Sequence, residues 1–334
     1  MIRRARRGSE GFGLIRTRLW LIPLAGALAG MAASPAGPPI RETRWIAQGS
    51  DVAAVLARRP VECLGPPVPP DDRYAVEIGR VAFRTPMLLG GQAARAGLNC
   101  ASCHRNGRSN AVFAFPGLSG PPGTADVTSA LFSTRRDDGI DNPVPIPDLG
   151  GDKHHLRVDQ DPAQPTLGAF IRGLVVDEFD GAAPPPAVLA GLAAYVRAMD
   201  PARCTGKSDE AVTVAADVAD ARRAVRAAIA AIDRPDRATA TLMVEGARWQ
   251  LGQIDERYAL PALGREQAAI RSAALDLSAA LAVAGRGDRA FRDQLVAWLA
   301  RSPAWVGAIE RAEPTSLYAP AVLKGVFRPN GPTG

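Results

Sequence analysis

The chain has 334 residues, of which 47% are hydrophobic and 22% charged, and a formal net charge of +6. This length allows two domains, each with its own core. Six arginines and one glutamate in residues 1–33 contribute +5 of that charge. The remainder carries about +1, so the basic composition does not indicate a nucleic-acid-binding protein.

Residues 1–33 have the pattern of a secretory signal peptide. The basic segment MIRRARRG precedes an uncharged apolar segment, Leu19 to Ala33, and small residues allow cleavage after Ala32 or Ala36. A membrane-spanning helix needs about 20 apolar residues, so an uncleaved anchor is the less favoured alternative. We therefore expect a protein that is exported to the periplasm.

A lead-in segment, residues 34–70, is expected to pack against the following domain. SDVAAVLARR predicts a short helix capped by Ser50 or Asp51, and GPPVPP ends it. Export also permits disulfides, and we predict one between Cys63 and Cys204, with two separate thiols as the alternative.

The next segment, 71–206, contains all three histidines of the chain. DDRYAVEIGRVAFRT, PTLGAFIRGLVV and PPAVLAGLAAYVRAM predict three helices. On the first of these helices, one side is expected to carry Val76, Gly79, Ala82 and Phe83. Residues 115–165 are rich in glycine and proline, which predicts a long irregular loop that serves a site.

Residues 207–313 are alanine-rich and predict an all-helical domain with apolar stripes. The helices are expected to be separated by Pro235, Pro261, Gly285 and Pro303. Three tryptophans are expected in the core rather than at a cofactor, namely Trp249, Trp298 and Trp305. The final segment, 314–334, is expected to be a loose tail.

The segment LNCASCHRNGRSN carries Cys100, Cys103 and His104. A zinc site is disfavoured, because the adjacent Cys103 and His104 do not readily point at one metal together with Cys100. A thioredoxin-like redox pair needs a strand before the motif, and AARAGLN is not a β-branched strand.

Covalent haem c accounts for the whole motif. Two thiols, from Cys100 and Cys103, add to the two vinyl groups of a porphyrin, and His104 follows as an axial ligand of the iron. Attachment of this kind occurs after export, which agrees with the signal peptide. We therefore predict one haem, held by these three residues.

The sixth haem ligand stays open between several candidates. No methionine lies between His104 and Met199, and Met199 is expected in the core. Met87 is a candidate ligand or a packing residue, and His154 or His155 is a candidate within the glycine- and proline-rich loop. An open position on the iron is the remaining alternative.

Charged residues around the motif have two interpretations each. Arg105 and Arg108 are predicted either to pair with haem propionates or to lie in a solvated turn. Four loop acids are predicted to be turn residues, with proton transfer as the alternative: Asp137, Asp138, Asp141 and Asp148. No catalytic residue is assigned.

Residues 75–200 resemble a cytochrome c fold, and more narrowly the bacterial di-haem cytochrome c peroxidases and their methylamine-utilisation relatives. Gly79 and Phe83 are similar to the glycine and aromatic of the N-terminal cytochrome helix, and Tyr195 to the aromatic of its C-terminal partner. The gap of 21 positions from Gly79 to Cys100 is similar to that family's pattern. The chain has one attachment motif where the peroxidases need two haems, and Phe179-Asp180-Gly181 where many members have His-Asp-Gly.

The expected fold is mainly α, with a cytochrome c-like haem domain that contains a long loop insertion, followed by an all-helical domain. The expected function is single-electron transfer between periplasmic redox proteins. A peroxidase-type haem enzyme and a haem-containing sensor or structural subunit are the alternatives. The sequence does not indicate an oligomeric state.

Overall fold

The computed structural model describes residues 39–65, 70–128, 131–135, 138–151, 156–203 and 208–327. These residues belong to one compact unit that extends from Pro38 to Gly334. The unit is mainly helical, which confirms the predicted fold class at this level. None of its described helices is both long enough and apolar enough to cross a bilayer. The predicted signal peptide lies outside the described residues, and the boundaries at 71, 206 and 313 stay predictions.

The lead-in consists of η1 (Arg41–Trp45), α1 (Val52–Ala57) and β1 (Arg58–Pro60). As predicted, Asp51 caps α1, and its Oδ1 accepts a hydrogen bond from the backbone N–H of Ala54 at 2.9 Å. β1 pairs antiparallel with β4 (Asp209–Ala211) and ties the lead-in to the C-terminal helices.

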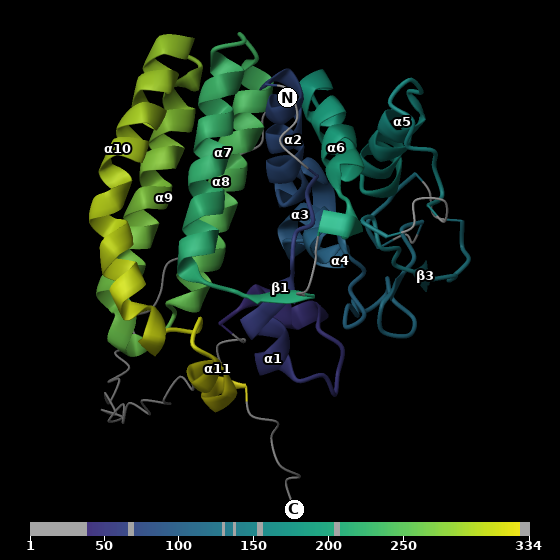
Figure 1. The fold of residues 1–334 in the computed structure, drawn as a ribbon, viewed down its shortest axis with the longest axis horizontal. Helices are drawn as coiled ribbons and strands as arrows, with labels where there is room; N and C mark the ends of the chain where they lie inside the picture. Colours follow the sequence, from purple (N-terminus) through teal and green to yellow (C-terminus); the bar gives the residue numbers. More distant parts are fainter. Residues whose placement is uncertain are drawn as a thin grey trace, which may run out of the picture. The chain divides into compact units, whose positions relative to one another are not determined.

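The expectation of a loose tail is wrong for residues 314–327. η8 (Glu313–Thr315) and α11 (Pro320–Val326) follow the last long helix, and α11 packs against α1 (Figure 1). Buried apolar residues join the two helices: Ile40, Ala53, Leu56, Ala57, Leu317 and Leu323. A seven-residue helix is too short for its apolar periodicity to be recognised in the sequence. What holds α11 in place is its packing against α1, which lies far away along the chain. Residues 328–334 lie outside the described part.

Two helices cross at paired glycines. α2 (Pro70–Phe83) and α6 (Pro186–Ala198) approach so closely that a Cβ on Gly79 would collide with the backbone carbonyl of Gly191. The rings of Phe83 and Tyr195 pack edge to face beside the crossing, with centroids 5.2 Å apart. Small residues at the crossing therefore bring the aromatic pair together.

Replacement of glycine by alanine is expected to have opposite effects at this crossing and at an exposed position of α8. Gly79→Ala adds a methyl group where backbone leaves no space, and we expect it to lower the free energy of unfolding by about 2 kcal/mol. Gly252→Ala, at an exposed helical glycine with open space around it, is the matched control and should raise that free energy by about 0.5–1 kcal/mol. Urea unfolding measures both, and an unchanged Gly79→Ala variant would contradict the close crossing.

Four long helices form the C-terminal part (Figure 1). They are α7 (Val214–Ile232), α8 (Arg237–Arg257), α9 (Gly264–Ala284) and α10 (Asp288–Ala312). Consecutive helices contact one another, α10 also contacts α7, and both α7 and α8 pack on α2. Trp298 lies in this core as predicted, and its Nε1–H donates to the carbonyl of Ala273 at 2.9 Å.

The expectation that Pro303 separates two helices is wrong, because Pro303 lies inside α10. Proline has no N–H for the carbonyl of Leu299, one turn earlier. The hydroxyl of Ser302 donates to that carbonyl instead, at 2.8 Å, and accepts a hydrogen bond from Arg222 Nε at 2.9 Å. The helix continues past Pro303 because the carbonyl of Leu299, which has no backbone donor, accepts a hydrogen bond from Ser302. Pro235, Pro261 and Gly285 do lie between helices, as predicted.

The remaining elements surround the cysteine motif. Before it are η2 (Pro86–Leu88) and α3 (Gly91–Ala96), and the motif itself forms α4 (Cys100–Cys103) and η3 (Arg105–Gly107). After it come β2 (Thr124–Ala125), β3 (Val144–Pro145), α5 (Thr166–Gly173) and the π-helical segment η5 (Leu174–Glu178). The described part of 115–165 is otherwise turns and irregular backbone, as predicted.

Candidate haem-attachment site

A capping box starts the helical turn that carries the two cysteines. The backbone N–H of Ser102 donates to Asn99 Oδ1, and that of Asn99 donates to Ser102 Oγ, each at 3.1 Å. Both side chains are buried. Hydrogen bonds from residues next to and between the cysteines therefore hold the turn.

Cys100 and Cys103 lie three positions apart on α4, so their side chains share one side of the turn. Both are free thiols, and burial raises the pKa of each to about 12. A reactive thioredoxin-type cysteine needs a lowered pKa, so these thiols do not have that character. The element before them is the helix α3, not the strand that a thioredoxin-like motif requires.

His104 is oriented by a backbone carbonyl. Its Nδ1 lies 3.0 Å from the carbonyl oxygen of Pro147, and because a carbonyl only accepts, Nδ1 carries the proton. Nε2 is thus the nitrogen left without a proton. Burial lowers the pKa of His104 to about 4, so the ring is neutral at pH 7. A neutral imidazole with its second nitrogen bonded to a carbonyl is the form that ligates metals.

The donor set of the motif therefore fits haem c. Two free thiols on one turn match two vinyl groups, and one oriented imidazole nitrogen matches one axial position on iron. Among the described residues, no three His, Cys, Asp or Glu side chains form a cluster that would hold a metal ion by themselves.

The loop after His104 is held from several sides. Asn106 has a left-handed backbone conformation, with φ of +48°. Its Nδ2 donates to the carbonyl of Pro60 at 2.8 Å, and its Oδ1 accepts from Arg84 Nη2 at 2.9 Å. Leu149, two residues after Pro147, donates its N–H to the carbonyl of Gly107 at 2.9 Å. These bonds join the motif to the segment that orients His104.

Two variants of Asn106 separate its side-chain bonds from its backbone conformation. Asn106→Ala should lose both hydrogen bonds and also place alanine at a positive φ. Asn106→Gly loses the same bonds without that strain, so we expect it to recover about 1 kcal/mol of the free energy of unfolding that the alanine variant loses. Urea unfolding of both variants checks this order; a glycine variant less stable than the alanine variant would refute it.

Arg84 connects Asn106 to a buried cluster of charges. Its Nη2 also donates to Glu62 Oε1 at 2.8 Å, and Glu62 accepts hydrogen bonds from Arg80 and from the hydroxyl of Tyr195. Although burial opposes ionisation, Arg84 and Arg80 lower the pKa of Glu62 well below its ordinary value. Glu62, Arg84 and Asn106 carry no motif of their own, and sequence analysis missed them.

The arginines after the motif have protein partners. Arg105 pairs with Glu42 at 3.3 Å and donates to the carbonyl of Val55 at 3.1 Å, which directs it to the lead-in. Its side chain is only 15% exposed, so the solvated-turn interpretation is wrong for Arg105. Arg108 pairs with Asp148 at 2.7 Å. Pairing with haem propionates stays a prediction for both.

The candidates for the sixth ligand lie in different environments. Met199 is buried, as predicted, and its sulfur packs against Gly107 in the loop that follows His104. Met87 is 57% exposed, which excludes the packing role considered for it and leaves ligation a prediction. His154 and His155 lie outside the described residues.

The loop acids behave as turn residues where they are described. Asp138 Oδ1 accepts from the N–H of Ile140 at 2.8 Å, and Asp148 Oδ1 from that of Gly150 at 2.9 Å. Asp141 is exposed, and Asp137 lies outside the described residues.

Phe179 takes part in a row of aromatic rings. The centroids of Trp45 and Phe115, Phe115 and Phe132, and Phe132 and Phe179 are 6.5, 5.3 and 5.9 Å apart. The next residue, Asp180, has φ of +54° and accepts from the N–H of Thr134 at 2.9 Å. Phe179 is thus a packing residue with no atom that can ligate iron.

Cys63 is disulfide-bonded, and its sulfur accepts a long hydrogen bond from Arg108 Nη1 at 3.7 Å. Its predicted partner, Cys204, lies outside the described residues, so the pairing stays a prediction.

Comparison with protein-family models, with curated proteins and with solved structures found no match for this chain.

Proposed function

We propose that the chain is an exported mono-haem c-type cytochrome that transfers single electrons between periplasmic redox proteins. The observation that carries this proposal is the hydrogen bond from His104 Nδ1 to the carbonyl of Pro147, next to two free thiols on one helical turn. The order Cys-x-x-Cys-His is the pattern of c-type haem attachment, and it uses all three residues.

The residues of the motif would hold the cofactor in two ways. Each thiol, of Cys100 and of Cys103, would add across one vinyl double bond, so that sulfur bonds to one carbon and the thiol hydrogen moves to the other. His104 would present Nε2 to the iron while Pro147 fixes the plane of its ring. When bound, haem supplies one-electron redox chemistry. The chain provides a neutral imidazole and an apolar surround, which together influence the potential.

The packing of α2 on α6 supports a cytochrome c-like domain. The glycine crossing and the contact of Phe83 with Tyr195 agree with the helix pair expected from the resemblance. A relationship to the di-haem peroxidase family remains part of the proposal. In that relationship, Phe179 would replace a histidine of the family by a ring that cannot ligate iron.

A peroxidase-type haem enzyme with an open sixth position is the second candidate. It is favoured because Phe179, which packs in the aromatic row, has no atom that can ligate iron. It is also favoured because the sulfur of Met199 packs against Gly107 in the loop after His104 and is thus engaged in packing. Carbon monoxide binding to the reduced protein distinguishes the two. Rapid binding would favour the open-iron enzyme, whereas no binding would favour an electron carrier whose iron has two protein ligands.

A reduced-minus-oxidised visible spectrum of the exported protein tests the leading proposal. We expect a haem spectrum that changes reversibly when the potential crosses a physiological value. A protein that carries no haem, or whose haem cannot be reduced at any physiological potential, would overturn electron transfer as its function.

A further inference from the structure

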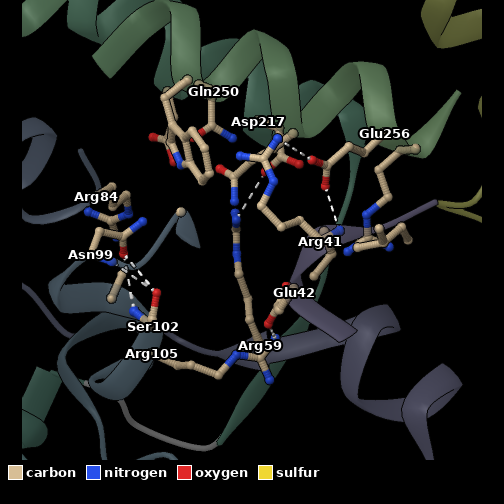
Figure 2. A pocket seen from close by; sticks show the side chains of 18 of the residues that line it. Arg41, Glu42, Arg59, Arg84, Asn99, Ser102, Arg105, Asp217, Gln250 and Glu256 are labelled. Carbon is tan, nitrogen blue, oxygen red and sulfur yellow. Dashed lines mark hydrogen bonds and ion pairs between the residues drawn. The ribbon is translucent and has the colours of Figure 1, made fainter. Parts of the chain in front are cut away.

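The two arginines that follow the motif bind different parts of the chain. Arg105 pairs with Glu42 in the lining of a pocket between α4 and the C-terminal helices (Figure 2). Trp249 also lines this pocket, so the expectation of a core position for this tryptophan is wrong. Neither His104 nor Arg108 is among the lining residues. Arg108 instead binds the segment that orients His104.

Residues 147–149, here called the orienting segment, bind the loop that begins at His104. The carbonyl of Pro147 accepts a hydrogen bond from His104 Nδ1 at 3.0 Å. The N–H of Leu149 donates to the carbonyl of Gly107 at 2.9 Å. The orienting segment contributes only backbone atoms to these two bonds, and backbone atoms do not distinguish one residue of the long loop from another. The side chain between them is the part of the segment that can specify this register.

Asp148 carries that side chain. Arg108 Nε donates to both of its carboxylate oxygens, at 2.9 and 2.7 Å. Asp148 Oδ1 also accepts from the N–H of Gly150 at 2.9 Å, which holds the turn directly after the orienting segment. The guanidinium of Arg108 makes a second contact, a long hydrogen bond from Nη1 to Cys63 Sγ at 3.7 Å. The lead-in therefore helps to place the cation to which the orienting segment binds.

We infer that Asp148 is a positioning residue for His104, because its ion pair with Arg108 holds the carbonyl of Pro147 against Nδ1. The side chains of Arg108 and Asp148 are 31% and 27% exposed, so water screens their attraction only in part. The inference rests on the proposed function, in which His104 ligates the haem iron through Nε2. A hydrogen bond from Nδ1 makes the imidazole a stronger donor to a metal. A stronger donor favours ferric over ferrous iron, so the ion pair lowers the haem potential.

Alanine variants of the two residues distinguish positioning from a direct effect of charge. Loss of the Asp148 carboxylate removes a negative charge, which by itself would raise the potential. Loss of the Arg108 guanidinium removes a positive charge, which by itself would lower the potential, as would the loss of a propionate partner. If the ion pair acts through the carbonyl of Pro147, Asp148→Ala and Arg108→Ala weaken the same hydrogen bond. Both variants then raise the potential.

A redox titration of the exported protein with its haem measures the potential of each variant. We expect Asp148→Ala and Arg108→Ala each to raise the ratio of reduced to oxidised haem at a fixed potential roughly tenfold, which is about 59 mV for one electron. Asp138→Ala is the matched control, because it removes the same charge and a similar turn bond, to the N–H of Ile140 at 2.8 Å, from the same loop. Its potential should equal that of the unchanged protein. A potential that falls or stays constant in either variant, or an equal rise in the control, would overturn the inference.

The position of the ring proton of His104 tests the same inference without haem. Nitrogen-15-labelled histidine is introduced into the full chain that carries Cys100→Ser and Cys103→Ser, and the His104 signals are identified by their loss in His104→Gln. We expect the proton to stay on Nδ1 in this protein, and to be shared between both ring nitrogens once Asp148→Ala is added. A shared proton before that change, or a proton fixed on Nδ1 after it, would overturn the positioning role. Absence of haem from the unchanged protein would overturn the proposed function alone.

Discussion

Replacing Cys100 and Cys103 together by serine is expected to abolish covalent haem attachment and leave the helical fold in place. A serine hydroxyl does not form the thioether bond, but it has nearly the same shape as the thiol. The turn itself is held by Asn99 and Ser102, which this variant keeps. Haem staining after denaturing electrophoresis measures the attachment, and far-ultraviolet circular dichroism measures the helix content.

Each single cysteine variant should keep one thioether and hence part of the stain. Ala101→Ser is the matched control, because it introduces the same hydroxyl into the same turn and retains both thiols. Covalent haem in the double variant, or its loss in the Ala101→Ser protein, would contradict the assignment of the two sulfurs.

The second large effect is expected at Glu62. Glu62→Gln removes the negative charge that compensates Arg80 and Arg84. Arg84 is then buried without the carboxylate that pairs with it. Breaking a buried pair in this way should lower the free energy of unfolding by about 3 kcal/mol. Glu210→Gln is the control, since its pair with Arg59 at 2.9 Å is 41% exposed on the glutamate side and is worth less than about 1 kcal/mol.

Glu62 also predicts a pH dependence. Its pKa in the folded protein is lowered from an ordinary value of 4.5, so its contribution is complete above that pH and is lost as the pH falls below it. Urea unfolding should therefore show that the difference between the unchanged protein and Glu62→Gln shrinks in acid. If this difference in the free energy of unfolding stays constant down to about pH 3, folding does not lower the pKa of Glu62.

Features with a local signal could be predicted from the sequence. The turn that carries Cys100 and Cys103 depends on five consecutive residues, and the cap at Asp51 on four. Apolar periodicity indicated the long helices, because each turn repeats the same facing position. Gly79 and Tyr195 could be related only through the resemblance, since 116 positions separate them.

Features that depend on distant backbone had no such signal. The group that orients His104 is a carbonyl of Pro147, and every residue has a carbonyl. Asn106 donates to the backbone carbonyl of Pro60 in β1 and accepts from Arg84, which directly follows α2, and neither residue belongs to a motif.

Some expectations were wrong because a rule for one residue type was applied without the neighbouring side chains. Pro303 was expected to end a helix, but the hydroxyl of Ser302 satisfies the carbonyl that proline leaves free. Trp249 was expected in the core because tryptophan is usually buried there, but its ring packs under Arg41 at a pocket. In each case the deciding neighbour was a polar side chain.

The mass of the intact, denatured protein from an oxidising compartment tests covalent haem attachment most directly. We predict the mass of the processed chain plus one haem, retained in denaturant and absent from the Cys100→Ser/Cys103→Ser variant. A processed chain without added mass, from cells that attach haem to another c-type cytochrome, would contradict the account.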